Sequence, residues 1–277
     1  MKTIIIPTDF SPVAINAMEY AVDLALAIDA SVVLLHVYQA PVSYSNSDIP
    51  LPLIDLDELE KINKQRIDEL KEQVQRKAPA TLAITGEVRL GDLLDELKTI
   101  CAETQPFAVV MGTKGAGFVE RLLVGSATLS AIRHLTSPVL VVPPNAVFKS
   151  IQRIGFACDF KKTVDEAPAA VIGKWVTTFN ASLSVLNVDD KKSNIKDTAE
   201  QSVLLYSVLK ELRPKYFYVD NPDVGAGISA FAESHNLDLL IVIPRRHRLV
   251  DLLFQKSHTK ELAFHSRIPI LSVPEKD

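Results

Sequence analysis

The chain alternates short apolar runs with longer amphipathic stretches. In its first 144 residues the apolar runs are rich in valine, isoleucine and leucine, which is typical of parallel strands buried on both faces. The stretches between them repeat apolar residues at helical spacing, and Ser11 followed by Pro12 marks a helix start. We therefore expect strands at 3–7, 31–37, 81–88, 106–111 and 138–143, and helices at about 12–28, 57–77, 92–103 and 126–135.

The same pattern restarts in the second half of the chain. RIGFACDF at 153–160 resembles TIIIPTDF near the start, so Asp159 aligns with Asp9 at an offset of 150 residues. The runs ASLSVLNV, LDLLIVIP and RIPILSVP repeat further strands, and a repeat this long indicates domain duplication. We predict two tandem five-stranded parallel-sheet α/β domains, at 1–144 and 145–277. Gly225 and Gly227 are expected to form a structural turn before a helix.

Composition narrows the class of protein. The 277 residues carry a net charge of −4, which does not favour nucleic-acid binding. The two cysteines belong to no CxxC motif or Cys/His cluster, so a structural zinc site is not expected. The apolar start is too short for a signal sequence, and no run has the length of a membrane helix. We expect a cytoplasmic protein with reduced thiols and no membrane partner.

One stretch carries the main chemical signal. GTKGAGFVERLLVGS, at 112–126, lies between the expected strand at 106–111 and the expected helix at 126–135. Glycines at the carboxyl end of a strand allow the backbone to approach a ligand closely. A glycine–serine pair that opens a helix offers free N–H groups at the positive end of the helix dipole. The stretch therefore predicts a phosphate-binding loop.

The spacing of this stretch resembles the G-2x-G-9x-G-(S/T) motif of the universal stress protein family. Gly112, Gly115 and the pair Gly125-Ser126 fit that spacing without a gap. PTDFS and SPVLVVP are similar to the family's first and fifth strands. The resemblance covers both halves and implies the adenine-nucleotide α-hydrolase-like (Rossmann-like) fold. It also implies that the two fifth strands pair inside one chain, as a pseudo-dimer.

The resemblance further implies a site for ATP or another adenine nucleotide. The resemblance implies that Asp9 forms a hydrogen bond with the nucleoside and that the Val37 main chain recognises the adenine edge. Magnesium would bind only together with a triphosphate. Backbone N–H groups and the Ser126 hydroxyl would hold the phosphates, with Lys114 adding a charge. The implied nucleotide-binding residues are Asp9, Val37, Gly112, Lys114, Gly115, Gly125, Ser126 and Ala127.

Each of these residues also has a purely structural interpretation. Asp9 suits a cap for the first helix, and Ser126 suits an N-cap for the helix that it opens. Gly112 and Gly115 suit turns, and Lys114 suits a solvated loop. His36, next to Val37, is typical of a packed core histidine.

The second half lacks glycines at the matching positions. If Ser257 is aligned with Ser126, Ile243 lies opposite Gly112, whereas a one-residue gap places Pro244 there. Side chains at these positions obstruct backbone approach, so we expect one nucleotide per chain, in the first half. In place of the glycine loop the second half has the basic cluster Arg245–Arg248. This cluster could bind a different anion or a protein partner, or it could form a solvated loop.

Three classes of function follow. The leading hypothesis is a regulatory, stress-response protein that binds ATP. The alternative is a protein-interaction module of the same family without nucleotide. An adenylate-forming enzyme is the third, but SGGxDS, HxGH and P-loop signatures are missing from the sequence. The residues include no committed general base, so we expect at most slow ATP hydrolysis. The signal, the protein partner and further dimerisation remain open.

Overall fold

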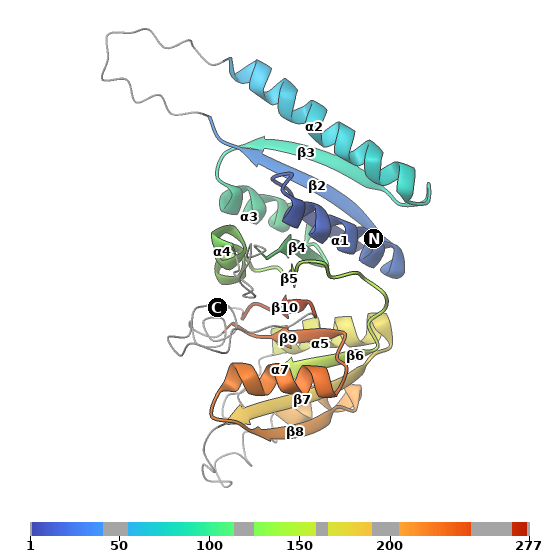
Figure 1. The fold of residues 1–277 in the computed structure, drawn as a ribbon, viewed down its shortest axis with the longest axis vertical. Helices are drawn as coiled ribbons and strands as arrows, with labels where there is room; N and C mark the ends of the chain where they lie inside the picture. The colour runs from blue at the N-terminus through green and yellow to red at the C-terminus, as the bar shows by residue number, and fades with distance from the viewer. Residues whose placement is uncertain are drawn as a thin grey trace, which may run out of the picture.

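The computed structural model describes residues 2–40, 55–113, 125–158, 166–189, 205–244 and 268–275. Its strands form one ten-stranded sheet in the order β3-β2-β1-β4-β5-β10-β9-β6-β7-β8 (Figure 1). The strands are β1 (Lys2–Pro7), β2 (Ala30–Tyr38), β3 (Ile84–Leu90), β4 (Ala108–Gly112), β5 (Val139–Val142), β6 (Arg153–Ala157), β7 (Ser182–Asp189), β8 (Lys215–Asp220), β9 (Leu239–Val242) and β10 (Ile270–Ser272).

Helices cover both faces of this sheet, as continuous apolar strands require. The described helices are α1 (Pro12–Ile28), α2 (Leu56–Lys77), α3 (Leu93–Thr104), α4 (Ser126–His134), α5 (Glu166–Phe179), α7 (Val224–Ser234) and the 3₁₀ turn η1 (Lys210–Leu212). Buried side chains of α1, α2 and α5 share one core with alternate strand residues. Those of α3, α4 and α7 share a second core on the opposite face. Each core includes residues from both halves of the chain, so both run along the whole sheet.

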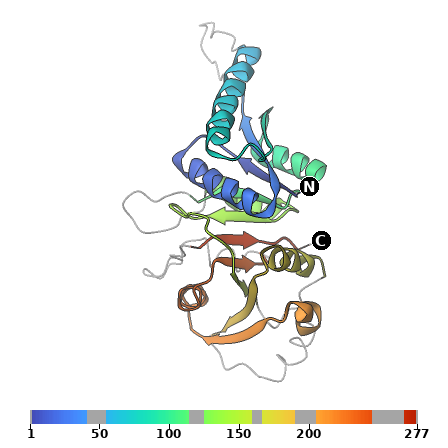
Figure 2. The ribbon, with the colours of Figure 1, turned by 90° about the vertical axis from the view of Figure 1, so that its right-hand side faces the viewer.

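The two halves meet through their last strands. Within each half the neighbouring strands pair in parallel, but β10 pairs with β5 antiparallel, with Leu271 opposite Leu140. Figure 2 shows β5 and β10 side by side at the middle of the molecule. The expected pairing of the two fifth strands inside one chain is confirmed.

The predicted α/β fold is confirmed, with some shifted elements. The helix predicted at 12–28 has these bounds, whereas the strand predicted at 81–88 runs from Ile84 to Leu90. Gly225 and Gly227 lie inside α7 rather than before it, so the predicted turn is wrong. A Cβ at Gly227 would lie 2.6 Å from Val188 Cγ1, so this glycine allows α7 to pack closely on β7.

Candidate functional site

The strand order reverses between β1 and β4. These neighbours pair in parallel, with Ile4 opposite Ala108, and their following helices α1 and α4 cover opposite faces. A crevice forms at such a reversal, outside the carboxyl ends of the strands, because the connections diverge there. The residues after Pro7 and after Gly112 therefore border the candidate site.

Asp9 lies at this edge, two residues after β1. Its Oδ1 accepts a hydrogen bond from the Ser11 N–H at 2.9 Å, and the Ser11 hydroxyl accepts one from the Ala14 N–H. Ser11 is thus the N-cap of α1, while Asp9 fixes the turn before it. Partial burial acts to raise the pKa of Asp9, but hydrogen bonds from Ser11 outweigh it and lower that pKa below its ordinary value. Asp9 is exposed and anionic at neutral pH, so its carboxylate can accept hydrogen bonds from hydroxyl groups of a ligand.

A buried network that no sequence motif indicates supports the Asp9 turn. Phe10 has a left-handed φ of 63°, which non-glycine residues rarely adopt. Its ring lies 4.7 Å from the His36 ring and 4.0 Å from the Arg66 guanidinium. His36 is buried, and its ring nitrogens contact the Thr8 carbonyl oxygen at 2.8 Å and Asn63 Oδ1 at 3.2 Å. The interpretation of His36 as a packed histidine is confirmed.

The Val37 main chain faces the same crevice. Along β2, the Tyr38 carbonyl accepts a bond from Gly91 on the β3 side, whereas the Leu35 carbonyl accepts one from Thr8 on the β1 side. Because these directions alternate, Val37 points toward β1. The last β1 residue paired with β2 is Pro7, opposite Leu35. The Val37 N–H and C=O therefore lie beyond the paired part of β1, where they can reach a planar ligand.

Gly112 ends β4 where α1 passes close by. A Cβ at this position would lie 2.6 Å from Val13 Cγ1 and 2.7 Å from the Val13 carbonyl oxygen. Helix packing alone therefore requires glycine here. Gly112 lies in β4 without a left-handed φ, so the turn expected for it is wrong, and close packing on Val13 explains this glycine without a ligand.

The first turn of α4 is open. Its N-cap is Gly125, and no side chain of the described residues caps it, whereas side chains of Ser11, Asp55, Asp92 and Asp223 cap α1, α2, α3 and α7. Ser126 is the first helical residue rather than the N-cap, so its predicted capping role is wrong. Ser126 and Ala127 are both exposed, which leaves their N–H groups available at the positive helix end.

A hydrogen bond joins α4 to the end of β4. The Thr128 hydroxyl donates to the Gly112 carbonyl oxygen at 3.0 Å, which places the open turn at the crevice. Thr113, the next residue along, is buried, and its hydroxyl has no hydrogen-bond partner among the described residues. Lys114 and Gly115 lie outside the described residues.

Strand register decides how the two halves correspond. Ala108 pairs with Ile4, and Leu239 pairs with Ile154, which is the equivalent of Ile4 in the repeat. Counting forward along each strand places Ile243 opposite Gly112, so the alternative with Pro244 is wrong. Ile243 is buried, so this half carries a full side chain where the first half has glycine. Arg245–Arg248, Lys256 and Ser257 lie outside the described residues.

Comparison with known proteins agrees with this architecture. The profile of the universal stress protein family matches residues 1–143, which is more than half of the chain. The chain belongs to the universal stress protein family. Universal stress protein MJ0531 of Methanocaldococcus jannaschii is 30% identical over 143 residues, covering 51% of this chain and 81% of that protein.

Solved structures extend the similarity in fold to the whole chain. A universal stress protein from Archaeoglobus fulgidus matches with a TM-score of 0.71 and 19% identity, covering 98% of this chain and 97% of that one. A functionally unknown protein from Pseudomonas aeruginosa matches with a TM-score of 0.60 and 12% identity, covering 99% and 92%. These TM-scores show a shared fold, and the ten-stranded arrangement is consistent with it.

The described residues show neither a metal cluster nor a membrane helix. No group of three or more His, Cys, Asp or Glu side chains there could hold a metal ion. Among the helices in that part of the chain, none is long and apolar enough to cross a membrane.

Proposed function

We propose that this universal stress protein is a regulatory protein that binds one adenine nucleotide, in the crevice between β1 and β4. The open first turn of α4 supports this most directly, because its uncapped N–H groups are held at the end of β4 by the Thr128–Gly112 hydrogen bond. A helix start with free N–H groups stabilises phosphate through hydrogen bonds and through the helix dipole.

Residues at the ends of β1 and β2 would bind the ribose and the adenine of the nucleotide. Asp9 is an anionic acceptor for ribose hydroxyls, and the Val37 main chain, beyond the paired part of β1, offers one donor and one acceptor to the adenine edge. Lys114 and Gly115 complete the phosphate loop in this proposal, and magnesium enters only with a triphosphate. The two tandem domains, 1–144 and 145–277, are unequal here, because Ile243 occupies the position of Gly112.

Calorimetric titration of the full chain with ATP tests the proposal. We expect one site per chain, and two equivalent sites would contradict it. ATP should bind more tightly than GTP, because the Val37 main chain matches adenine. ADP and AMP titrations then report how far the phosphates contribute.

A designed variant tests the open helix start. Ser126→Pro removes one N–H and the hydroxyl, yet proline is favoured at the first helical position, as Pro12 of α1 shows. Gly125, the preceding residue, is extended, with a ψ of 152°, and so accommodates a following proline. We expect about tenfold weaker ATP binding with folding retained, since hydrogen bonds to charged groups contribute about 1.5–3 kcal/mol. Unchanged affinity would overturn the phosphate site.

The alternative is a protein-interaction module of the same family without nucleotide. The hydrogen bond that Asp9 accepts from the Ser11 N–H and the packing of Gly112 on Val13 favour it, because both Asp9 and Gly112 then have structural roles. Absorbance at 260 nm of the protein purified without added ligand, followed by the titration above, separates the two functions.

A further inference from the structure

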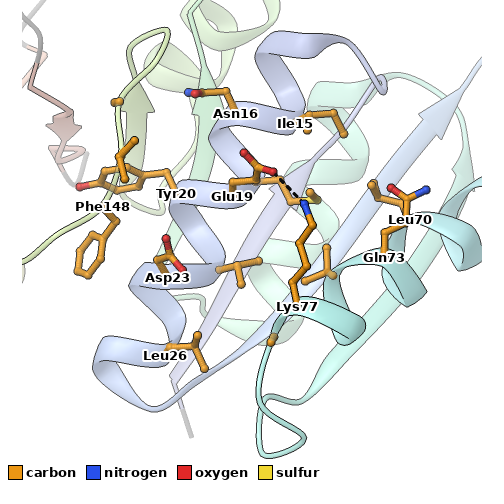
Figure 3. A pocket seen from close by; sticks show the side chains of 16 residues that line it. Ile15, Asn16, Glu19, Tyr20, Asp23, Leu26, Leu70, Gln73, Lys77 and Phe148 are labelled. Atoms are coloured by element: carbon orange, nitrogen blue, oxygen red, sulfur yellow. Dashed lines mark ion pairs between the residues drawn. The ribbon is translucent and has the colours of Figure 1, made fainter.

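A pocket of about 340 Å³ lies on α1, between α2 and the segment 146–148 (Figure 3). The residues proposed for the nucleotide site do not line it. Small-molecule sites in proteins have volumes of about 300–1,000 Å³, so this pocket has room for a compact ligand.

Apolar side chains form much of the pocket and remain in contact with solvent. Val147 is 70% exposed and Leu26 is 38% exposed, while Val74, which also lines the pocket, is buried. Phe148 also lines the pocket, and its ring lies nearly perpendicular to the Tyr20 ring at 5.4 Å. Exposed apolar surface that gathers at a concave site is typical of a binding site.

Two carboxylates give the pocket a negative charge. Glu19 and Asp23 lie one helical turn apart on α1, where like charges repel. Glu19 forms an ion pair with Lys77 at 3.5 Å, whereas Asp23 has no ion pair within the described residues. In Figure 3 the Glu19–Lys77 pair bridges α1 and α2, and Asp23 lies on the side of α1 nearer to Phe148.

The environment of Asp23 leaves its charge poorly compensated. Partial burial, followed by the charge of Glu19, raises the pKa of Asp23 above its ordinary value. A cation placed beside Asp23 would stabilise its ionised form against both the partial burial and the repulsion from Glu19.

The fold itself does not require this acidic pair. At an offset of 150 or 151 residues, the repeat has Ala169 or Ala170 in place of Glu19, and Gly173 or Lys174 in place of Asp23. The helix α5, which carries those residues, covers its sheet without either acid. The carboxylates are thus a property of the first half alone.

We propose that this pocket binds a small organic monocation, an ammonium or guanidinium group on an apolar body. The cation lies beside Asp23 and the apolar body contacts Leu26, Val147 and Phe148. The Phe148 ring adds an attraction for a cation that approaches its face. One net negative charge remains after the Glu19–Lys77 pair, which matches a single positive charge on the ligand.

Three probes of similar shape test the charge requirement on the full chain. They are 2-phenylethylammonium, the neutral 2-phenylethanol and the anionic 3-phenylpropanoate, titrated by ligand-observed NMR. We expect measurable binding of the ammonium compound, at least about fivefold weaker binding of the alcohol and no binding of the anion. Equal binding of all three probes would overturn the proposal.

Matched variants locate the probe. Asp23→Asn should weaken ammonium binding about fivefold, whereas Asp68→Asn, at an exposed carboxylate of α2 outside the pocket, should leave it unchanged. Val147→Ser should weaken it as well, because it removes apolar contact. Saturating ATP should not compete with the probe. Competition, or equal effects of Asp23→Asn and Asp68→Asn, would refute the assignment of the site.

Discussion

The Trp175 ring packs on the Phe107 ring, with their centroids 4.6 Å apart. Phe107 precedes β4 in the first half, and Trp175 belongs to α5 in the second. Both side chains are buried, and the ammonium groups of Lys2 and Lys174 lie over the Phe107 ring at 5.7 and 5.1 Å. This aromatic pair joins the two halves on the face of the sheet that α1 and α5 cover.

Phe107→Ala should destabilise the chain by about 3–5 kcal/mol, because it leaves a cavity against the indole. Trp175 is the only tryptophan in the sequence, so its fluorescence reports this contact directly. We expect red-shifted emission and a lower midpoint of denaturant unfolding. Phe179→Ala is the control within the second half, since Phe179 lies 5.8 Å from Trp175 and is only partly buried. Phe179→Ala should lower the free energy of unfolding by less than Phe107→Ala does. Unchanged tryptophan emission in Phe107→Ala would contradict the packing of Phe107 on Trp175.

Gly112→Ala should destabilise the chain by about 1–3 kcal/mol, because its Cβ would meet the Val13 backbone and side chain. The control is Gly173→Ala, inside α5, where a Cβ meets only Leu212 Cδ2 at 4.0 Å. That change should be neutral or stabilise by up to about 1 kcal/mol, because alanine favours helix. Chemical denaturation of both variants measures the contrast, and equal effects would be inconsistent with close packing at Gly112.

Replacing the serine at the start of α1 or of α4 by alanine should have different effects on stability. Ser11→Ala should cost about 1 kcal/mol, because the Ser11 hydroxyl caps the Ala14 N–H. Ser126→Ala should change stability by less than about 0.5 kcal/mol, since Ser126 is the first helical residue and caps no N–H group of the described residues. The proposed phosphate site predicts weaker ATP binding for Ser126→Ala. Thermal unfolding and ATP titration together separate the two roles.

Asp9 and Asp23 should affect stability with opposite pH dependence. The folded pKa of Asp9 is lowered, so its contribution is present above the unfolded pKa and is lost as pH falls through the folded value. Asp9→Asn should therefore cost stability at pH 7, and this cost should shrink in acid. The folded pKa of Asp23 is raised, so ionisation at neutral pH opposes folding and Asp23→Asn should stabilise. Unfolding measured from pH 3 to 7 gives the sign of each effect.

Local signals in the sequence predicted much of the fold. The helix at 12–28 had both a capping serine and a proline at its first position, and its bounds are as predicted. The hydrophobic pattern predicts no strand at 215–220, where β8 forms. This edge strand reads KYFYVD, with charged residues at both ends and no fully buried side chain, so it lacks the valine-, isoleucine- and leucine-rich run of the central strands.

The site was harder to predict than the fold. Motif spacing identified Gly112 and Ser126, but it did not distinguish ligand contact from packing, because the conflict at Gly112 comes from Val13 in another element. The His36–Asn63 contact joins β2 to α2, and the pocket proposed to bind a cation is lined by α1, α2 and the segment after β5. Such arrangements depend on tertiary packing rather than on sequence spacing.

The antiparallel pairing of β5 with β10 also affects how the molecule can associate. Each fifth strand has its partner in the same chain, so in the described sheet only β3 and β8 have an unpaired edge, at opposite ends. Two copies could associate through the same edge, with β3 against β3 or β8 against β8, or through different edges, with β3 against β8. A β3-to-β8 contact would not close on itself and would extend the sheet from one molecule to the next. The exposed side chain of Tyr218 on β8 lies at one of these two edges.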